Sequence, residues 1–557
     1  MPYNLIHEAW LPGRRASGRR LWIKPADVTN DLSGDPIVAL DFPRPDWNAA
    51  ITEFLIGLYT CALAPQDEKK WRHYWLHPPT PDALAEKLEC ISFAFNLDGN
   101  VPRAFQDFDE IDGDEPWPAN KLLIDGPGVD GSSPAGLFMK PSAVVGLGEP
   151  YAAAALITLQ TFTSGPGRGH KASFRGVGPL TIHVDPNGSY WQRVWSNAPL
   201  LGDDSPPFHL PGTHPVWARI FPWLQPFPRL VGPDDANKSL LPFFACPLKI
   251  RLRFSELTGN ACSFGGPVSH LTVQEYETIH GGSNYVGFDH PLSPYKEIKI
   301  KKTGVTEREP LKAAKVFASY RDWLGLWGHG WEEGSETKYF ESSNVRLWRT
   351  RRSGYAIKAQ LRGFGFEFKS AKTKYFHSAE FPDLQLTDTN TSEFFEKVTQ
   401  IIRAAHMAAE NLIEAVVIAR LYRWNDKKQN FLPVGKRSAK TEKIVSQPYE
   451  GRLWRETEKT FRSHFQELLS DPSDKSDEIR KSWLKTIKSV ALRIFDDNIA
   501  PEDSWNDDPK RLVYARSKLT YAFRPTYQWS KPKDRGAVWE ALGLNPLLRP
   551  KRTDGFL

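Results

Sequence analysis

The chain has 557 residues, of which 40% are hydrophobic and 25% charged, as in ordinary globular proteins. This length predicts about two to four domains, and no apolar run approaches the roughly 20 residues that a membrane span needs. The net charge of +6 is uneven, because the residues from Thr391 onward hold 31 Lys and Arg against 23 Asp and Glu. A basic C-terminal third favours contact with a polyanion or with a partner bound to one, although a solvated helix surface explains the same surplus.

The four cysteines form no C-x-x-C pair, and their spacing indicates no disulfide framework. The N-terminus, MPYNLIHEAW, lacks the basic and then apolar pattern of a secretion signal. We therefore expect a protein of the reducing cytoplasm that has no membrane partner.

Short strands and amphipathic helices are expected in the N-terminal part. Residues 21–23 and 37–40 are strand candidates between Gly and Pro signals, and residues 46–64 and 78–90 carry apolar side chains at helical spacing. Residues 91–96 look extended.

A loop rich in Gly, Pro and Asp ends the segment 119–131, ANKLLIDGPGVDG. We expect this loop to be exposed. Such loops can carry binding residues on a rigid scaffold, although a plain surface connection is the commoner role.

The stretch from Ala155 to Val184 concentrates glycine and basic residues. Its members are Gly165, Gly167, Gly169, Gly176 and Gly178, interleaved with Arg168, His170, Lys171 and Arg175. Glycine permits positive φ and close approach of the backbone, and the cations attract an anion. We interpret the stretch as a basic loop that exposes its backbone to nucleic acid; ordinary turns explain the glycines equally well. A P-loop is excluded, because Lys171 follows His170 and precedes Ala172.

The middle of the chain predicts irregular structure interrupted by strands. Residues 199–247 are rich in Pro and Trp with little periodicity, and residues 248–254 alternate as a half-buried strand does. The segment 296–302, KEIKIKK, indicates an edge strand whose lysines either guard against sheet-to-sheet pairing or contact phosphate.

A hairpin is predicted at residues 361–376. Residues 361–368 alternate as a strand, Lys369 to Lys372 form a short turn, and residues 373–376 form the return strand. A tip of small and basic residues can enter a DNA groove, but lysine-tipped hairpins are also common surface features.

From Thr391 onward the pattern changes to long helices. Apolar residues at helical spacing indicate a helix of over 25 residues, followed by helices at about 453–469, 479–495 and 509–523. We predict an α+β protein in which a large irregular mixed α/β N-terminal domain, residues 1–388, precedes a C-terminal four-helix bundle, residues 389–557, with a basic tail.

Four stretches in the same order resemble segments of the CasA family, the large subunit of the type I-E CRISPR surveillance complex Cascade. They are NLIHEAWLPGRR near the N-terminus, residues 156–181 with the glycines, SNYVGFDHPLSPY at 283–295, and RLWRETEKTF at 452–461. The resemblance covers nearly the whole chain.

The resemblance implies a non-catalytic subunit without a cofactor. Its implied partners are the other Cascade subunits, the CRISPR RNA, the target double-stranded DNA and the CRISPR helicase–nuclease. In such systems base pairing reads the target sequence while protein reads the short PAM duplex. This family inspects the PAM from the minor groove, with a glycine loop, a wedge at a hairpin tip and a lysine finger. It also positions the displaced non-target strand.

Carried over to this chain, the glycine loop falls on Gly165, Gly167, Arg168 and Gly169, with Lys171 beside it. Arg168 stands where a relative has glycine, and arginine also suits a narrow minor groove.

The wedge falls on Lys369, Ser370 and Ala371, where relatives carry Asn or Gln in place of the serine. The lysine finger has no clear match, and His280 is the nearest basic candidate.

The family's first long loop resembles LLIDGPGVDG, which places Leu123 and Asp125 where relatives have an apolar or aromatic residue and an Asn. We expect contact from this loop with nucleic acid or a neighbouring subunit. An Asp would repel phosphate, so it would accept a hydrogen bond from a base amino group or from protein.

Many relatives hold zinc with two pairs of cysteines. Here residues 147–151 replace the first pair, and the second region keeps only Cys262. Because zinc needs four ligands, we predict no structural zinc and no other metal site.

The competing class is an enzyme, such as a metal-dependent nuclease acting on the same DNA. The chain has 14 His, but neither H-E-x-x-H nor G-x-S-x-G occurs, and no catalytic residue is assigned.

Overall fold

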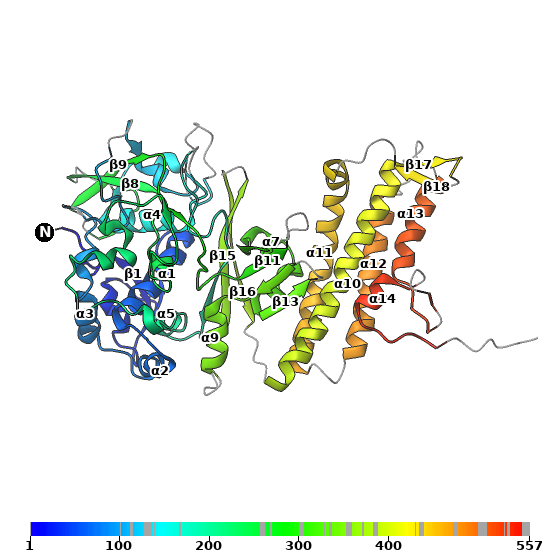
Figure 1. Cartoon of the computed structure of the whole chain (residues 1–557), viewed down its shortest axis with the longest axis horizontal. Helices are drawn as coiled ribbons and strands as arrows, with labels where there is room; N and C mark the ends of the chain where they lie inside the picture. Colours follow the sequence, from blue (N-terminus) through cyan, green and yellow to red (C-terminus); the bar gives the residue numbers. More distant parts are fainter. Residues whose placement is uncertain are drawn as a thin grey trace, which may run out of the picture. The chain divides into compact units, whose positions relative to one another are not determined.

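The chain folds into two compact units of mixed α and β structure (Figure 1). The computed structural model describes residues 2–100, 102–111, 115–126, 136–138, 140–165, 169–256, 262–267, 270–299, 306–327, 329–333, 337–352, 359–369, 372–382, 388–428, 430–433, 439–471, 476–499, 509–528, 530–531 and 535–548. Unit 1 comprises Met1–Ala314 and Gly325–Asp383, and unit 2 comprises Lys315–Leu324 and Leu384–Leu557. The predicted α+β class is confirmed: most strands lie before residue 383, and the long packed helices α10–α13 follow it.

Helices occur along the whole chain. The α-helices are α1 (Pro45–Leu63), α2 (Glu68–Leu76), α3 (Pro81–Glu89), α4 (Glu149–Phe162), α5 (Tyr190–Trp195), α6 (Leu241–Phe244), α7 (Ala313–Ala318), α8 (Leu324–Trp327), α9 (Ser343–Arg352), α10 (Asp388–Leu421), α11 (Ala439–Ser470), α12 (Ser476–Ile499), α13 (Pro509–Ala522) and α14 (Ala537–Ala541). Short 3-10 helices lie at Pro25–Thr29, Ser92–Ala94, Ala119–Leu122, Pro141–Ala143, Gly202–Asp204, Pro215–Arg219, Pro222–Leu224 and Tyr320–Asp322.

The strands form several small sheets. They are β1 (Leu11–Arg15), β2 (Arg20–Ile23), β3 (Ile37–Leu40), β4 (Trp117–Pro118), β5 (Leu147–Gly148), β6 (Thr181–Asp185), β7 (Leu230–Val231), β8 (Lys249–Glu256), β9 (Leu271–Ile279), β10 (Asn284–Tyr285), β11 (Tyr295–Lys299), β12 (Thr306–Pro310), β13 (His329–Glu333), β14 (Thr337–Phe340), β15 (Gln360–Lys369), β16 (Lys372–Pro382), β17 (Tyr422–Asn425) and β18 (Asn430–Pro433). The sheet orders are β2-β1-β3, β12-β11-β14-β13, β16-β15-β6 and β4-β9-β5 with β8 on β9, beside the pairs β10-β7 and β17-β18.

Helix α1 is the core helix of unit 1. Pro45 is in its first turn, where the fixed φ of proline suits the helix. The helix ends at the cap residue Ala64, whose φ of 42° is in the left-handed region. Nearly all of its side chains are buried, and it packs against α4, α5 and α6. The helix predicted at residues 46–64 is therefore confirmed within one residue at each end.

The long green hairpin β15–β16 in Figure 1 is the predicted hairpin. Its register runs from Gln360 opposite Pro382 to Lys369 opposite Lys372, and β15 pairs on its other edge with β6. Phe364 and Phe366 point into a cluster with Ala50 and Phe162, the last residue of α4. The hairpin is thus fixed to the end of α4.

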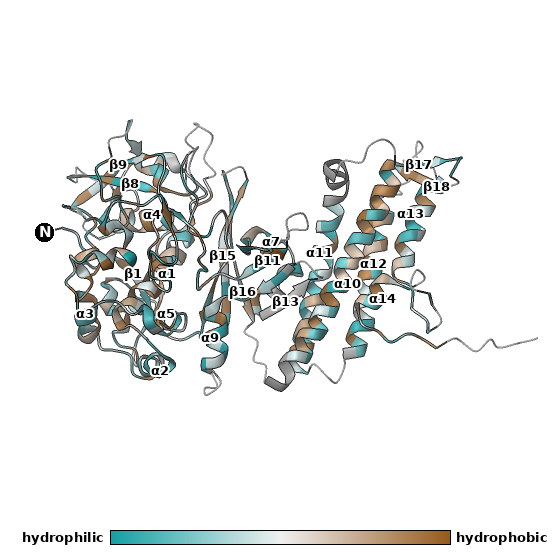
Figure 2. Cartoon of the chain, viewed as in Figure 1, coloured by the Kyte–Doolittle hydropathy of each residue, from teal (hydrophilic) through white to brown (hydrophobic). Residues whose placement is uncertain are grey.

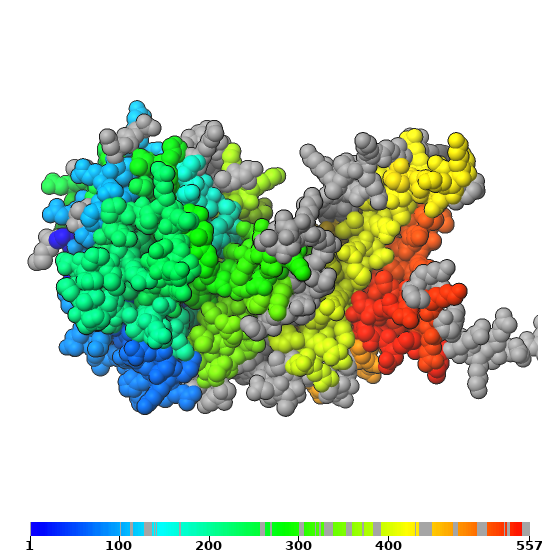
Figure 3. Space-filling model, in the orientation of Figure 1, coloured from blue at the N-terminus to red at the C-terminus, as the bar shows by residue number. Residues whose placement is uncertain are grey.

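Unit 2 is built around α10, which packs against α11, α12, α13 and α14. Its buried face follows the predicted period, and brown and teal residues alternate along it in Figure 2. The Trp483 indole on α12 donates a 2.7 Å hydrogen bond to the Ile401 carbonyl. In Figure 3 the red surface around α14 lies directly against the yellow surface of α10.

A short segment from the middle of the chain, Lys315–Leu324, completes the core of unit 2. The Tyr320 ring stacks on Phe461 of α11 with centroids 4.0 Å apart, and its hydroxyl lies 2.9 Å from that of Thr457. Trp323 packs edge-on against Phe461 at 5.7 Å.

Several element predictions are corrected. Residues 91–96 contain the 3-10 helix Ser92–Ala94 and are not a strand. Strand β11 is not an edge, because β12 and β14 pair with it on both sides; residues 300–302 of that prediction lie outside the described residues. Helix α11 begins at Ala439, well before the expected residue 453, and α14 lies in the tail to which no structure was assigned.

Among the described helices none is long and apolar enough by itself to cross a membrane. Helices α1 and α2 meet that test only as a pair bent by 110°. All four cysteines are free thiols, with Cys61 and Cys246 buried and Cys90 exposed.

Candidate nucleic-acid interface

The glycine segment forms a loop closed at its base. The Ser173 amide donates a 2.8 Å hydrogen bond to the Thr163 carbonyl, directly after α4, and the Gly165 amide donates to the Thr163 hydroxyl at 3.1 Å. Gly165 and Gly169 have φ of 85° and 91°, in the left-handed region that glycine adopts without a steric penalty. We call residues 164–172 the glycine loop. Gly167 and Arg168 lie outside the described residues.

The far side of the glycine loop rests on the turn after β9. The Gly281 amide donates a 3.0 Å hydrogen bond to the Gly169 carbonyl, and His170 forms a parallel bridge with Gly281. A Cβ atom on Gly169 would lie 2.8 Å from Nδ1 of His280, and one on Gly165 would lie 3.2 Å from the His170 carbonyl oxygen. Gly165, Gly169 and His280, selected separately from the sequence, are therefore neighbours, with Lys171 in the same loop.

A buried ion cluster holds the C-terminal side of the glycine segment. The Arg175 guanidinium donates two 3.0 Å hydrogen bonds to the carboxylate of Glu53 on α1, and Nε2 of His290 lies 3.1 Å from Oε1 of Glu53. All three side chains are at least 95% buried. The cluster connects α1, the glycine segment and the HPL stretch.

Charge balance in the cluster is visible in its pKa values. Burial alone would raise the pKa of Glu53, but Arg175 and His290 outweigh burial and lower it to about 2. Burial, followed by repulsion from Arg175, lowers the pKa of His290 to about 4. The Glu53 carboxyl is therefore ionised beside a neutral His290 imidazole at neutral pH.

The hairpin carrying the predicted wedge is attached near the base of the glycine loop. The Phe366 and Phe162 ring centroids are 5.9 Å apart, and the Thr373 hydroxyl donates a 2.6 Å hydrogen bond to the Ile124 carbonyl. Lys369 and Lys372 are exposed where the two strands end. Ser370 and Ala371, the predicted tip, lie outside the described residues.

The expected exposure of Leu123 and Asp125 is corrected. Both residues are at least 97% buried. Asp125 accepts a 2.8 Å hydrogen bond from the Arg44 guanidinium, which also binds Asp46, and another of 2.8 Å from the Leu137 amide. Asp125 points into the protein because its carboxylate neutralises the buried Arg44 guanidinium. Both side chains are therefore too buried for a direct contact with nucleic acid; residues 127–131 of that loop lie outside the described residues.

The segments around residues 145–151 and 262–264, where the resemblance placed cysteine pairs in relatives, are held together by hydrogen bonds and by a contact between two rings. The Gly148 amide donates to Sγ of Cys262 at 3.3 Å, and the Val145 amide donates to the Ser263 hydroxyl at 3.0 Å. The Tyr151 and Phe264 rings lie 5.4 Å apart. In the part of the chain that the structure describes, no group of three or more His, Cys, Asp or Glu could hold a metal ion.

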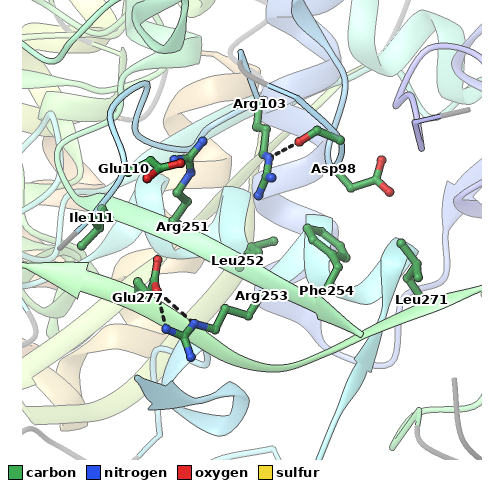
Figure 4. Close-up of a pocket in the computed structure, with 11 residues that line it drawn as sticks. Asp98, Arg103, Glu110, Ile111, Arg251, Leu252, Arg253, Phe254, Leu271 and Glu277 are labelled. Carbon is green, nitrogen blue, oxygen red and sulfur yellow. Dashed lines mark hydrogen bonds and ion pairs between the residues drawn. The ribbon is translucent and has the colours of Figure 1, made fainter. Parts of the chain in front are cut away.

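A polar cleft of about 650 Å³ lies on the outer face of β8 and β9 (Figure 4). Three arginines and three carboxylates line it. Arg253 pairs with Glu277 at 2.5 Å, Arg103 donates to the Gly99 carbonyl at 2.7 Å, and Arg251 lies beside Glu110 in the close-up. Because the charges balance, this cleft does not favour a polyanion.

Helix α12 of unit 2 presents a basic stripe. Lys481 and Lys485 are exposed and Lys488 is half-buried, at a spacing that places them on one face, while Trp483 and Ile487 are fully buried. Among the described residues no acidic side chain pairs with these three lysines. This lysine stripe offers phosphate-binding charge that no described carboxylate pairs with.

Sequence reasoning missed the residues that act across the fold. Glu53 stands in an apolar helix, which is itself a signal, because a carboxylate there needs a buried cation. Trp117 lies far from the glycines in sequence, yet its ring is 5.7 Å from that of His170. No spacing rule links such distant positions.

The sequence matches the family described as CRISPR-associated protein Cse1 over residues 4–494. No curated protein matches the chain.

Solved structures share the fold at low sequence identity. Cse1 from Acidimicrobium ferrooxidans has a TM-score of 0.62 and 17% identity, covering 94% of this chain and 99% of its own. CasA (Cse1) from Thermus thermophilus has a TM-score of 0.62 and 15% identity, covering 93% and 98%. A chain of a structure described as a CRISPR RNA-guided surveillance complex has a TM-score of 0.66 and 17% identity, covering 93% and 99%.

Proposed function

Because the chain belongs to the CRISPR-associated Cse1 family, we propose that it is the large, non-catalytic subunit of a type I-E CRISPR Cascade complex. It would assemble with the other Cascade subunits and the CRISPR RNA in the cytoplasm. A similar fold in a CRISPR RNA-guided surveillance complex supports this assignment.

The proposed task is recognition of the PAM in target double-stranded DNA through the minor groove. One observation carries this proposal: Gly169, exposed and at positive φ, lies in a loop that packs against His280 and whose base, at the buried Gly165, is next to the hairpin β15–β16. Backbone and small side chains read a groove that distinguishes mainly A·T from G·C, so a relaxed PAM preference is expected.

The wedge and the finger complete the proposed reading head. Lys369, Ser370 and Ala371 would enter the duplex beside the PAM, and His280 would take the place of the lysine finger. Gly167, Arg168 and Lys171 would line the loop's approach to the phosphates. After the duplex opens, the subunit would recruit the helicase–nuclease that degrades the target.

Omitting this chain from an otherwise complete complex tests the function. We expect the complex without the chain to bind PAM-bearing and PAM-free targets alike, because guide pairing remains while PAM reading is lost. The measurement is the ratio of the two dissociation constants at fixed salt. An unchanged ratio would contradict the proposal. The isolated chain should leave DNA intact with Mg²⁺ or Mn²⁺; metal-dependent turnover would favour a nuclease.

The lysine stripe of α12 is proposed to contact the displaced non-target strand. Replacing Lys481, Lys485 and Lys488 by Gln should reduce the slope of log affinity against log salt by about 2, since each single-strand phosphate contact contributes about 0.7. The measurement is a salt titration of the complex on target DNA.

Three exposed lysines of unit 1, Lys69, Lys87 and Lys238, provide a matched control, because their change to Gln removes the same charge. Equal slopes for the two triple variants would show that net charge alone matters and would remove the stripe from the model of binding.

A further inference from the structure

Four aromatic rings run from the core of unit 1 to its surface beside the glycine loop. Their centroids are separated by 5.8 Å from Tyr276 to Trp117, 5.7 Å from Trp117 to His170 and 5.0 Å from His170 to His280. Tyr276 is 99% buried, Trp117 and His170 are half-buried, and His280 is exposed. The row therefore ends in two imidazoles at the loop proposed to meet DNA.

The row is built on rigid structure. Trp117 of β4 stands opposite Tyr276 of β9 in register, and the Tyr276 hydroxyl donates a 3.3 Å hydrogen bond to the Lys121 carbonyl. The Lys121 ammonium lies 4.5 Å from the centre of the Trp117 ring, a cation–π distance. His170 is tied to the turn after β9 through its bridge with Gly281, which keeps the two imidazoles together.

Among the described residues, the acidic side chains near the two imidazoles do not pair with them. Lys121 faces the row from the 3-10 helix Ala119–Leu122, and Lys171 follows His170 in the glycine loop. Glu275 and Glu277 of β9 pair instead with Arg253, and Glu115 is the acidic residue before β4. Within the described ranges no carboxylate lies at ion-pair distance from His170 or His280.

His170 carries an unsatisfied position. Its Nδ1 atom is buried and has no hydrogen-bond partner among the described residues. Burial, and then the neighbouring His280, lowers the pKa of His170. The protonated form of His170 is therefore disfavoured in the free chain. A nearby anion would offset the repulsion from His280 and would supply a counter-charge.

We propose that the pair His170–His280 binds a phosphodiester group of the target DNA and takes up a proton as it does so. The proposal rests on the function proposed above, since it assumes that DNA approaches the glycine loop. It assigns to the pair a phosphate contact that is separate from reading of the base edges by the loop backbone. Trp117 and Lys121 hold the pair in position.

The consequence is an affinity that rises as pH falls. A group whose protonation is favoured in the complex binds more protons there than in the free chain, so complex formation strengthens with proton concentration. Uptake of one full proton changes the dissociation constant about tenfold per pH unit. Because uptake at one pair is partial near neutrality, we expect about threefold to tenfold tighter binding at about pH 6 than at about pH 8.

The test measures target DNA binding by the complete complex from about pH 6 to about pH 8 at constant ionic strength. Variants are His170→Gln and His280→Gln, each of which removes a titrating imidazole while keeping a polar side chain. We expect both to flatten the pH profile. His170→Gln should leave the ratio of PAM to non-PAM affinity within about twofold of the original, whereas His280→Gln, at the finger candidate, should also lower that ratio. His209→Gln, at an exposed histidine outside the row, is the control and should keep the full profile.

Each outcome separates the two proposals. A wild-type profile without pH dependence, or a profile unchanged in both His variants, overturns the phosphate contact and leaves PAM reading intact. A pH dependence that appears in assembly with the CRISPR RNA, and not in DNA binding, also overturns it. Loss of PAM discrimination on removing the chain remains the criterion for the function itself.

Discussion

Replacing Arg175 by Met should lower the free energy of unfolding of unit 1 by about 3 kcal/mol, at the lower end of the range for breaking a buried ion pair. Arg175 donates two hydrogen bonds to Glu53, and both side chains are buried. Without the guanidinium, the Glu53 carboxylate would remain in the core with only His290, 3.1 Å away, to become protonated and compensate in part. Calorimetric or denaturant unfolding of the chain measures the change.

The double variant Glu53→Gln with Arg175→Met is the matched control. Removing both charges abolishes the desolvation penalty, so we expect it to recover most of the lost stability. Equal stability of the single and double variants would mean that lost packing, and not an unpaired charge, explains the effect.

The same pair fixes the sign of a pH effect. The folded pKa of Glu53, about 2, lies below its ordinary value of 4.5. Because the folded pKa is lower than the unfolded pKa, the ionised Glu53 carboxylate stabilises the fold at pH values above 4.5. This stabilisation disappears as pH falls from 4.5 toward 2. The original chain should lose this contribution on acidification, and the double variant should lack it at every pH.

The variant Gly169→Ala should reduce PAM discrimination by about 5-fold to 30-fold, equivalent to about 1–2 kcal/mol, because the new Cβ displaces part of the proposed reading head. Gly169 has φ of 91°, and its new Cβ would lie 2.8 Å from Nδ1 of His280. Either the glycine loop or the His280 ring must move, and both belong to the proposed reading head. The measurement is the ratio of affinities for PAM and non-PAM targets in the complete complex.

Gly176→Ala supplies the matched control within the same segment. Gly176 also has positive φ, 75°, but a Cβ there would meet no atom within 4 Å. It shares the backbone strain and lacks the contact with the finger candidate. Ser370→Asp, at the predicted wedge, should reduce discrimination independently by placing a negative charge against phosphate. Unchanged discrimination in both Gly169→Ala and Ser370→Asp would remove these elements from PAM reading.

Local periodicity predicted those helices and strands whose conformation depends least on residues distant in the sequence. Helix α10 and strand β15 have long, regular patterns and lie where those patterns predicted them, whereas β16, predicted at residues 373–376, runs from Lys372 to Pro382. Strand β11 shows the limit of this reasoning. Its alternating lysines suggested an edge, but β14, about 40 residues later, pairs with its second side, and no local signal announces that partner.

The candidate site shows the same limit, because residue types are visible in the sequence whereas partners distant in the sequence are not. Gly165, Gly169 and Lys171 were selected because glycine and charge are visible in the sequence. Asp125 was misplaced because its partner, Arg44, is 81 residues away and makes the loop's acidic residue a core residue. A family resemblance supplied His280, whereas its neighbours Trp117 and His170 are brought together by the β4–β9 pairing and by the bridge from His170 to Gly281.

The segment Lys315–Leu324 means that the chain enters unit 2, leaves it and returns. During synthesis Tyr320 leaves the ribosome well before Phe461, the ring on which it stacks. The helices of unit 2 therefore fold around an aromatic segment, Lys315–Leu324, that has already been synthesised; we call this segment the plug. A fragment starting at Leu384 would leave the Phe461 and Thr457 side of α11 uncovered. Exchange of bundles between related proteins therefore needs two splice junctions, one on each side of this plug, besides the one at Leu384.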